Sequence, residues 1–401
     1  MQAKTRLKIR KRFRGKGDKV ANRFSLGKLQ KGRYFDPILI LIILLITAFG
    51  LVMLYSVSSY NANVQFGDSA YYFKKQLTNT LIGFAVMMVV GFIPYRFWQK
   101  CQVLIYAVAV ILLILIIPYG VRVNGAKRWL RIAGISVQPA EIAKIAVIIV
   151  TAYVLVKIGS GVDTFKGFVY SLAAAVPLVL MIYLITGNLS SAIIVAGIAF
   201  VMSYAVSRNH RKYLLSLLLV VAAGAAYVFY VIKSDGSLGF RSERILAWLD
   251  PNAYASGKGF QTLQALYAIG SGGYMGKGIG ESMQKLGYIP EAQNDMIFAI
   301  ICEELGFLGA VGIILLFLIL LWRCLIIALN APDKFGSLIV VGFMAHIAIQ
   351  VILNIAVVTN TVPNTGISLP FISYGGSSVV SLMFEVGLII SVQRSIRVKE
   401  D

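Results

Sequence analysis

Long apolar runs separated by short polar segments dominate the pattern of this sequence. The run from Pro37 to Leu54 has no charged residue, and neither has the run from Val103 to Tyr119. A helix needs about 20 such residues to cross the hydrocarbon core of a bilayer. Helices of soluble proteins keep a polar face, whereas these runs are apolar nearly all round. About ten transmembrane helices are therefore expected, at residues 37–54, 76–93, 103–119, 138–157, 168–186, 190–207, 213–232, 296–322, 338–358 and 376–393.

Composition agrees with this pattern, because 58% of the 401 residues are hydrophobic and only 14% are charged. A soluble chain has a far higher charged fraction. The predicted fold class is all-α, a polytopic membrane protein with one long external loop between the seventh and eighth helices. The predicted organisation is a basic cytoplasmic tail at 1–36 and a membrane domain at 37–395, with the external loop at 233–295 inside it.

The formal net charge of +21 raises the alternative of nucleic-acid binding, and the distribution of charge argues against it. Residues 1–36 contain 13 Lys or Arg and only two acidic residues. With this tail in the cytoplasm, ten spans place 25 of the 38 basic residues inside and 12 outside, with Lys144 within a span. This is the positive-inside pattern. The charge therefore indicates orientation, with both termini cytoplasmic, and the tail could also contact anionic lipid headgroups.

The cysteines and histidines of this chain give no sign of a disulfide, a metal site or a catalytic triad. The three cysteines, Cys101, Cys302 and Cys324, lie within or at the ends of spans and form no disulfide or metal pattern. His210 and His346 stand alone in the sequence, which argues against a histidine metal site or a Ser–His–Asp triad. We expect no cleavable signal peptide, because the basic stretch is too long and a full span follows it.

The long loop carries six basic and six acidic residues, and a loop of that length is expected to be functional or partly folded. Its stretch Phe260–Ile269 has helical spacing and is expected to rest on the membrane surface. The glycine-rich run Gly270–Gly280 resembles a phosphate loop, but Lys277 is followed by Gly278 rather than Ser or Thr. A sharply turning loop is the better interpretation, and close backbone approach to a pyrophosphate stays open.

Three groups of ionisable residues lie where charge is costly. Glu141 and Lys144 are three apart, on one helix face, and could form a structural ion pair or line a functional cavity. Glu303 and Glu304 in the eighth span, with Glu385 in the tenth, favour a structural role. Glu291–Asp295 directly precedes an apolar run, and Asn294 or Asp295 is a natural N-cap for that helix. From the residues alone, capping is favoured over catalysis.

Three ordered motifs stand out in the sequence: Gln138–Lys144, Gln284–Ala299 followed by Glu303–Gly306, and Thr365–Ser378. With these motifs the chain resembles the SEDS family of shape, elongation, division and sporulation proteins over about residues 37–395. The resemblance is slightly closer to the division and sporulation members, through Ile367–Pro370. Members are bacterial peptidoglycan glycosyltransferases that polymerise lipid II in the cell membrane beside a class B penicillin-binding protein.

The resemblance implies that Asp295 is the catalytic residue, as general base for the acceptor sugar hydroxyl, with undecaprenyl pyrophosphate as leaving group. It implies that Glu141, Lys144, Ser373 and Ser377 support the same cavity. Among the external cations, Lys127, Arg128, Arg241 and Arg244 are candidates to bind the pyrophosphate, with headgroup contact as the alternative. No metal site has ligand spacing and no cofactor is certain, although a divalent cation, Mg²⁺ or Mn²⁺, would suit the chemistry.

The chain departs from the family pattern at two places. Many relatives have Thr-Asp-Phe at Asn294-Asp295-Met296, and the aspartate is kept. Relatives often carry a carboxylate where this chain has Gly187-Asn188-Leu189-Ser190, so no catalytic role is expected there.

Two other functions stay open. Ten helices with a buried Glu–Lys pair would also suit a translocator of lipid-linked sugars. A scaffold that only recruits the transpeptidase is a weaker alternative.

Overall fold

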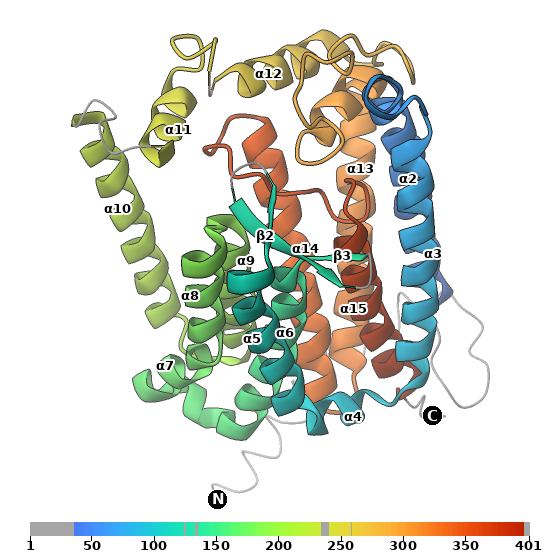
Figure 1. The fold of residues 1–401 in the computed structure, drawn as a ribbon. Coiled ribbons are helices and arrows are strands. Elements are labelled where there is room, and N and C mark those ends of the chain that lie inside the picture. The colour runs from blue at the N-terminus through green and yellow to red at the C-terminus, as the bar shows by residue number, and fades with distance from the viewer. Residues whose placement is uncertain (1–35, 124–125, 133–134, 234–239, 258, 397–401) are drawn as a thin grey trace, which may run out of the picture. The chain divides into compact units, whose positions relative to one another are not determined.

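The computed structural model describes residues 36–123, 126–132, 135–233, 240–257 and 259–396. Apart from Asp36, the predicted basic tail lies outside the described residues. Phe35–Ile396 forms one compact unit, which is helical apart from its loops and three short strands (Figure 1). Its long helices are α2 (Pro37–Phe66), α3 (Tyr71–Phe92), α5 (Gln102–Tyr119), α6 (Pro139–Ile158), α9 (Leu189–Val206), α10 (Arg211–Lys233), α13 (Ile297–Asn330), α14 (Lys334–Val358) and α15 (Gly376–Arg394).

In the described part of the chain, nine helices are long and apolar enough to cross a membrane. A tenth span is formed if α7 (Phe165–Ala173) and α8 (Ala175–Thr186), which meet at 47°, are taken together. The expected helix at 168–186 is thus broken. Pro177 lacks an N–H and its ring conflicts with the carbonyl four residues earlier, at Ala173, which accounts for the bend. The predicted polytopic α-helical class is confirmed.

Local signals fix the ends of the first span. The Asp36 carboxylate accepts hydrogen bonds from the backbone N–H groups of Ile38 and Leu39, at 3.1 and 3.4 Å, and Pro37 occupies the first helical position. Gly67 ends the helix with φ of 68°, a left-handed conformation that glycine adopts at no steric cost. The span is therefore longer than its apolar run, because polar residues up to Phe66 continue the helix.

Helix α14 lies in the middle of the bundle and contacts α6, α9, α13 and α15. Helices α3 and α15 pack closely along their lengths, where Gly83 faces Met383 and Gly387 faces Val90. In lipid no hydrophobic force drives helices together, so close packing has to hold them. Small residues such as glycine allow this close approach of the two backbones. Helix α10 buries only Tyr213 and Val231, as expected for a span that faces lipid on most sides.

The two ends of this unit differ. Figure 1 shows α4 (Tyr95–Lys100) and α7 at one end and α11 (Phe240–Leu249) and α12 (Phe260–Gly272) at the other. Side chains predicted to be cytoplasmic meet at the α4 end, where Arg323 pairs with Asp36, Arg96 with Asp333, and Arg394 donates to Gly91 O. This arrangement fits the alternating topology, while the assignment of this end to the cytoplasm stays a prediction.

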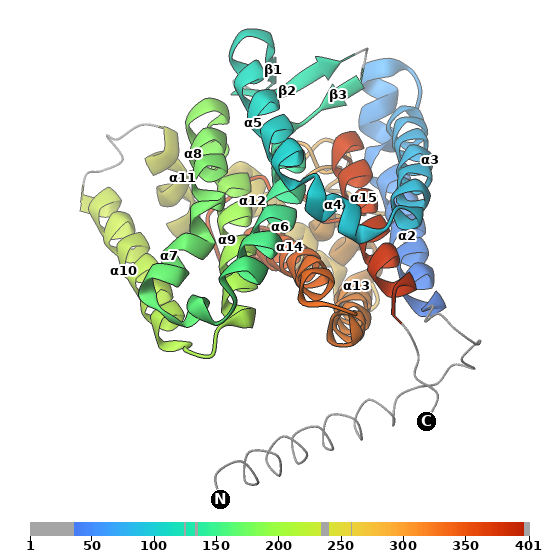
Figure 2. The ribbon, with the colours of Figure 1, turned by 90° about the horizontal axis from the view of Figure 1, so that it is seen from below.

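The segment between α5 and α6 forms a small antiparallel sheet that the sequence did not predict, of order β1-β2-β3. It contains β1 (Val121–Val123), β2 (Ala126–Ile132) and β3 (Ile135–Val137). Val121 pairs with Trp129 and Arg131 with Ser136. Figure 2 shows the sheet beside α5, and it also contacts α6, α8 and α15. The sheet holds the basic residues of this loop in fixed positions.

Helix α13 is interrupted at Gly306, whose φ of 66° and ψ of −163° are not helical. The glycine-rich loop fills this break, so its predicted role as a sharply turning loop is consistent with the positive φ of Gly273, Gly276, Gly278 and Gly280. Four backbone hydrogen bonds replace those that the helix loses: Lys277 N to Glu303 O, Gly278 N to Glu304 O, Phe307 N to Gly273 O and Leu308 N to Tyr274 O.

Gly306→Ala is expected to destabilise the protein by about 1–3 kcal/mol, because an L side chain is strained at this φ. A Cβ would also lie 2.3 Å from the backbone nitrogen of Gly276, which cannot move aside cheaply. Thermal unfolding of the purified protein in detergent measures the loss. Gly312→Ala in the same helix is the control, since a Cβ there meets nothing within 4 Å. Equal midpoints for the two variants would contradict the prediction.

Candidate active site

A cavity of about 2170 Å³ opens between the sheet, α3, α5, α6, α10, α11 and the loops around α12 and α13. Its wall is apolar where α5 and the second half of α3 contribute, as at Ile82, Val86 and Leu104. Charged side chains gather in the other part of the wall. They are Lys74, Lys75, Arg128, Arg131, Glu141, Arg244, Glu291 and Asp295. A cavity with one polar and one apolar region can hold an amphipathic molecule.

Asp295 lies on this wall, half-buried, in the turn that leads into α13. Gln261 of α12 donates to Asp295 Oδ1 at 3.5 Å. The Asn354 side chain of α14 donates to the Asp295 backbone oxygen at 2.9 Å, which fixes the main chain at this point. Gly366 approaches from the other side, where a Cβ would lie 3.6 Å from Asp295 Oδ2. The carboxylate is thus bonded by α12, while α14 holds its main chain.

The prediction that Asn294 or Asp295 caps α13 is wrong. The N-cap of α13 is Met296, with no side-chain capping bond, and the Asp295 carboxylate faces the cavity instead. Burial raises the pKa of Asp295 to about 6, and the nearby Glu291 carboxylate adds to the rise while Arg244 and Gln261 oppose it. A carboxylate with a pKa near neutrality is suited to proton transfer.

The predicted Glu141–Lys144 pair forms, with 2.8 Å between Nζ and Oε1, and both side chains are buried. Glu141 lines the cavity, and Ser378 donates to its second oxygen at 3.4 Å. Lys144 does not line the cavity; it lies behind Glu141 and also reaches Gln350 Oε1 at 3.4 Å. A three-residue spacing puts the two side chains on one face, but the helix rotation turns only the first toward the cavity.

The two predicted serines differ in the same way. Ser377 lines the cavity and accepts a hydrogen bond from Gln138 N at 3.3 Å. Ser373 does not line it, because its hydroxyl is buried and accepts from Leu369 N at 2.8 Å. Ser373 therefore shapes the turn before α15, and its predicted place in the cavity wall is corrected.

The four predicted pyrophosphate ligands are also divided by the structure. Arg128 of β2 and Arg244 of α11 line the cavity, and burial together with the Arg244 charge lowers the pKa of Arg128. Two guanidinium groups on one wall favour an anion between them. Lys127 does not line the wall, since its Nζ donates to Ile117 O at 3.0 Å. The side chain of Arg241 lies outside the described residues.

Sequence reasoning missed Lys74 and Lys75 at the start of α3, although both line the cavity. The only signal was a pair of basic residues in a predicted external loop, where few are expected. It also missed Gln261 and Asn364, which are joined by a 3.0 Å hydrogen bond beside Asp295. Polar amides in a loop carry no pattern that distinguishes them from solvated surface.

The remaining buried carboxylates form separate pairs. Glu303 pairs with Lys277, Glu304 with Lys285, and Glu385 with His346 at 2.9 Å, so Glu385 does not join the first two. Within the residues that the structure describes, no three His, Cys, Asp or Glu side chains gather to hold a metal ion. The divalent cation that the sequence allows stays a prediction.

The fold and the cavity define a multi-pass α-helical membrane protein with a half-buried carboxylate facing cationic groups at one end of the bundle. Residues 36–398 match the FtsW/RodA/SpoVE family of cell cycle proteins. The chain belongs to this family, which is the family that the sequence motifs indicate.

Relatives and solved structures agree with this assignment. The chain is 39% identical to the stage V sporulation protein E of Bacillus subtilis, over 90% of this chain and 97% of that protein. It is 35% identical to a probable peptidoglycan glycosyltransferase FtsW of Trichlorobacter lovleyi, over 90% and 94%. A chain from a peptidoglycan synthase complex, solved in work on coordination of polymerization and crosslinking, is 25% identical with a TM-score of 0.73, over 90% and 98%. The rod shape determining protein RodA of Thermus thermophilus shares the fold, with a TM-score of 0.63 at 24% identity, over 90% and 97%.

Proposed function

We propose that this chain is a peptidoglycan glycosyltransferase that polymerises lipid II, with Asp295 as general base and undecaprenyl pyrophosphate as leaving group. Relatives of more than 30% identity that align with nearly the whole chain are named for this glycosyltransferase activity. The observation that carries the chemistry is the half-buried Asp295 carboxylate on a cavity wall that also presents Arg128 and Arg244. The apolar wall from α3 and α5 would accommodate a lipid tail.

In the proposed reaction, Asp295 accepts the proton of the acceptor sugar's 4-hydroxyl as that oxygen attacks the anomeric carbon of the growing strand. The new C–O bond forms while the bond to pyrophosphate breaks, and the leaving pyrophosphate takes the electron pair. Arg128 and Arg244 stabilise the negative charge that develops on it. Because pyrophosphate is already a good leaving group, one well-placed carboxylate suffices and no paired acid is required.

The partner and the orientation are part of this proposal. A similar chain was solved within a peptidoglycan synthase complex, which supports a class B penicillin-binding protein as partner. The α11–α12 end would face the outside of the cell membrane, since the charge pattern places the basic residues of the other end in the cytoplasm. The cell wall is assembled on that side.

The direct test uses purified chain, its cognate class B partner and lipid II. The partner should carry no polymerase activity alone. We expect glycan strands only when this chain is present. In the competing hypothesis of a lipid II translocator, proteoliposomes would move labelled lipid II across the bilayer and form no polymer. That outcome would overturn the glycosyltransferase proposal.

The pH dependence of polymerisation should report Asp295. The base must be ionised, so the rate is constant above the pKa and falls as pH drops through about 6, approaching a tenfold loss per pH unit. An ordinary aspartate would keep its activity down to about pH 4. The charged groups facing this carboxylate are Glu291 on its own loop and Arg244 of α11. Initial rates across this range measure the acidic limb, and a limb near pH 4 would contradict the prediction.

A further inference from the structure

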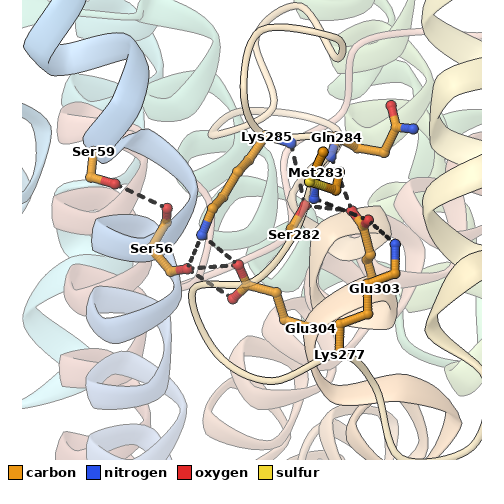
Figure 3. A network of polar contacts seen from close by, with 9 residues as sticks. All are labelled: Ser56, Ser59, Lys277, Ser282, Met283, Gln284, Lys285, Glu303 and Glu304. Atoms are coloured by element: carbon orange, nitrogen blue, oxygen red, sulfur yellow. Dashed lines mark hydrogen bonds and ion pairs between the residues drawn. The ribbon is translucent and has the colours of Figure 1, made fainter.

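A buried ion pair joins the loop before Asp295 to two transmembrane helices (Figure 3). Lys285 Nζ lies 2.9 Å from Glu304 Oε1 of α13 and 3.2 Å from the Ser56 hydroxyl of α2. Ser56 is 2.8 Å from each oxygen of Glu304, so the three groups form a closed triangle. Their exposed fractions are 5%, 0% and 7% for Lys285, Glu304 and Ser56.

A second pair fixes the start of the same loop. Lys277 Nζ lies 2.7 Å from Glu303 Oε1, and Ser282 donates to the other oxygen of Glu303. The backbone N–H groups of Met283 and Gln284 also point to this carboxylate, at 3.2 and 3.4 Å. Adjacent glutamates of α13 therefore hold the loop at two points, one of them shared with α2.

The segment from Ser282 to Asp295 is anchored along its length. Ile289 and Ala292 are fully buried between the two ends. Near Asp295, Tyr374 N donates to Gln293 O at 2.9 Å. A segment held at its start, its middle and its end has little conformational freedom. The Lys285 anchor lies ten residues before Asp295, at the other end of this segment.

Stability alone does not require a buried ion pair here. Removing two charges from water carries a large desolvation penalty, and well-packed apolar side chains often replace such pairs with no loss of stability. An ion pair with a shared hydroxyl, in contrast, brings the loop, α2 and α13 to one point, so its contacts constrain where the loop lies. The triangle of Lys285, Glu304 and Ser56 therefore specifies where the loop sits more than it holds the fold together.

We propose that Lys285, Glu304 and Ser56 are positioning residues, which fix the Asp295 segment against α2 and α13 in the geometry needed for glycosyl transfer. This inference rests on the proposed function, because it assigns these residues a role in that reaction. They contribute through the loop, and Asp295 alone contacts the substrate hydroxyl.

The test compares Lys285→Met with the double variant Lys285→Met/Glu304→Gln. The single variant leaves a buried carboxylate without its cation and should lose both thermal stability and activity. The double variant removes both charges and should regain a midpoint near that of the wild type. Its kcat should stay at least about tenfold low while KM for lipid II changes by less than about twofold, because misplacement affects the transition state more than binding. Recovery of both stability and kcat would overturn the proposal.

Ser56→Ala keeps the inference testable if the double variant does not fold. It removes one hydroxyl next to the pair and should lower kcat several-fold at unchanged KM, whereas wild-type kcat would overturn the proposal. Arg96→Gln is the matched control, since its ion pair with Asp333 lies at the other end of the bundle and is largely exposed. Wild-type protein that forms no polymer would refute the proposed function itself. Polymerisation by the wild type with unaltered kcat in the variants would refute only the positioning role.

Discussion

Asp295→Asn is expected to lower the rate of lipid II polymerisation by about 10²–10⁴-fold, the usual contribution of a positioned general base. Asparagine has nearly the same size and its side-chain oxygen can still accept the hydrogen bond from Gln261. The backbone contact to Asn354 does not involve the side chain, so the loop should keep its position. What the variant loses is the ability to take a proton. Strand formation from lipid II in the presence of the partner measures the effect.

Glu291→Gln is the matched control for this experiment. Glu291 is also a carboxylate on the cavity wall, four residues earlier, but its side chain is exposed and pairs with Asn294 in the same loop. Its substitution should leave polymerisation within a few-fold of the wild type. Normal polymer from Asp295→Asn, or equal losses from the two variants, would remove Asp295 from the role of base. Thermal unfolding should show that both proteins are folded.

The spans were predictable because the bilayer imposes one simple rule on every helix that crosses it. Backbone polar groups cannot be left unpaired in lipid, so each long apolar run becomes a helix. The rule does not specify where a helix bends. Pro177 breaks the fifth span and Gly306 breaks the eighth, and both follow from local backbone chemistry. The sheet at β1–β3 was missed because two of its strands are three residues long and carry no clear alternation.

The candidate site was less predictable, since sequence spacing does not fix the rotation of a helix. Glu141 and Lys144 share a helix face, yet only Glu141 reaches the cavity. Asp295 precedes an apolar helix, which favours capping when only local propensity is considered. Tertiary contacts with α12 and α14 instead turn its carboxylate into the cavity. The resemblance to the family predicts a catalytic role for this aspartate, whereas the residue pattern alone does not.

The basic residues that predict the orientation of the protein are different from the charged residues that line the candidate site. The excess of basic residues predicts which end faces the cytoplasm, whereas the proposed chemistry uses a few charges at the other end. Arg128 and Arg244 share a wall with Asp295, and the two kinds of charge have separate tasks in the proposed reaction. A base requires partial burial to raise its pKa, while the cations require only access to the leaving group.

Lys144→Met is expected to lower the free energy of unfolding by about 3–5 kcal/mol, because it leaves the buried Glu141 carboxylate without its cation. Lys144 is 2% exposed and Glu141 is 5% exposed, so little water reaches the pair to replace the missing partner. Ser378 donates one long hydrogen bond to Glu141, and a neutral hydroxyl cannot neutralise the charge of the carboxylate. Unfolding of the purified protein, followed by heat or denaturant, measures the loss.

The double variant Glu141→Gln/Lys144→Met should regain most of this stability, because no charge then remains buried. Lys157→Met serves as the control in the same helix: Lys157 is exposed at the far end of α6, so its loss should change stability by less than about 1 kcal/mol. A double variant as unstable as the single one would show that the methylene packing of Lys144, and not its charge, supports α6. In that case the pair would have no electrostatic part in holding Glu141 at the cavity wall, and Glu141 would be positioned by α15 through Ser378 instead.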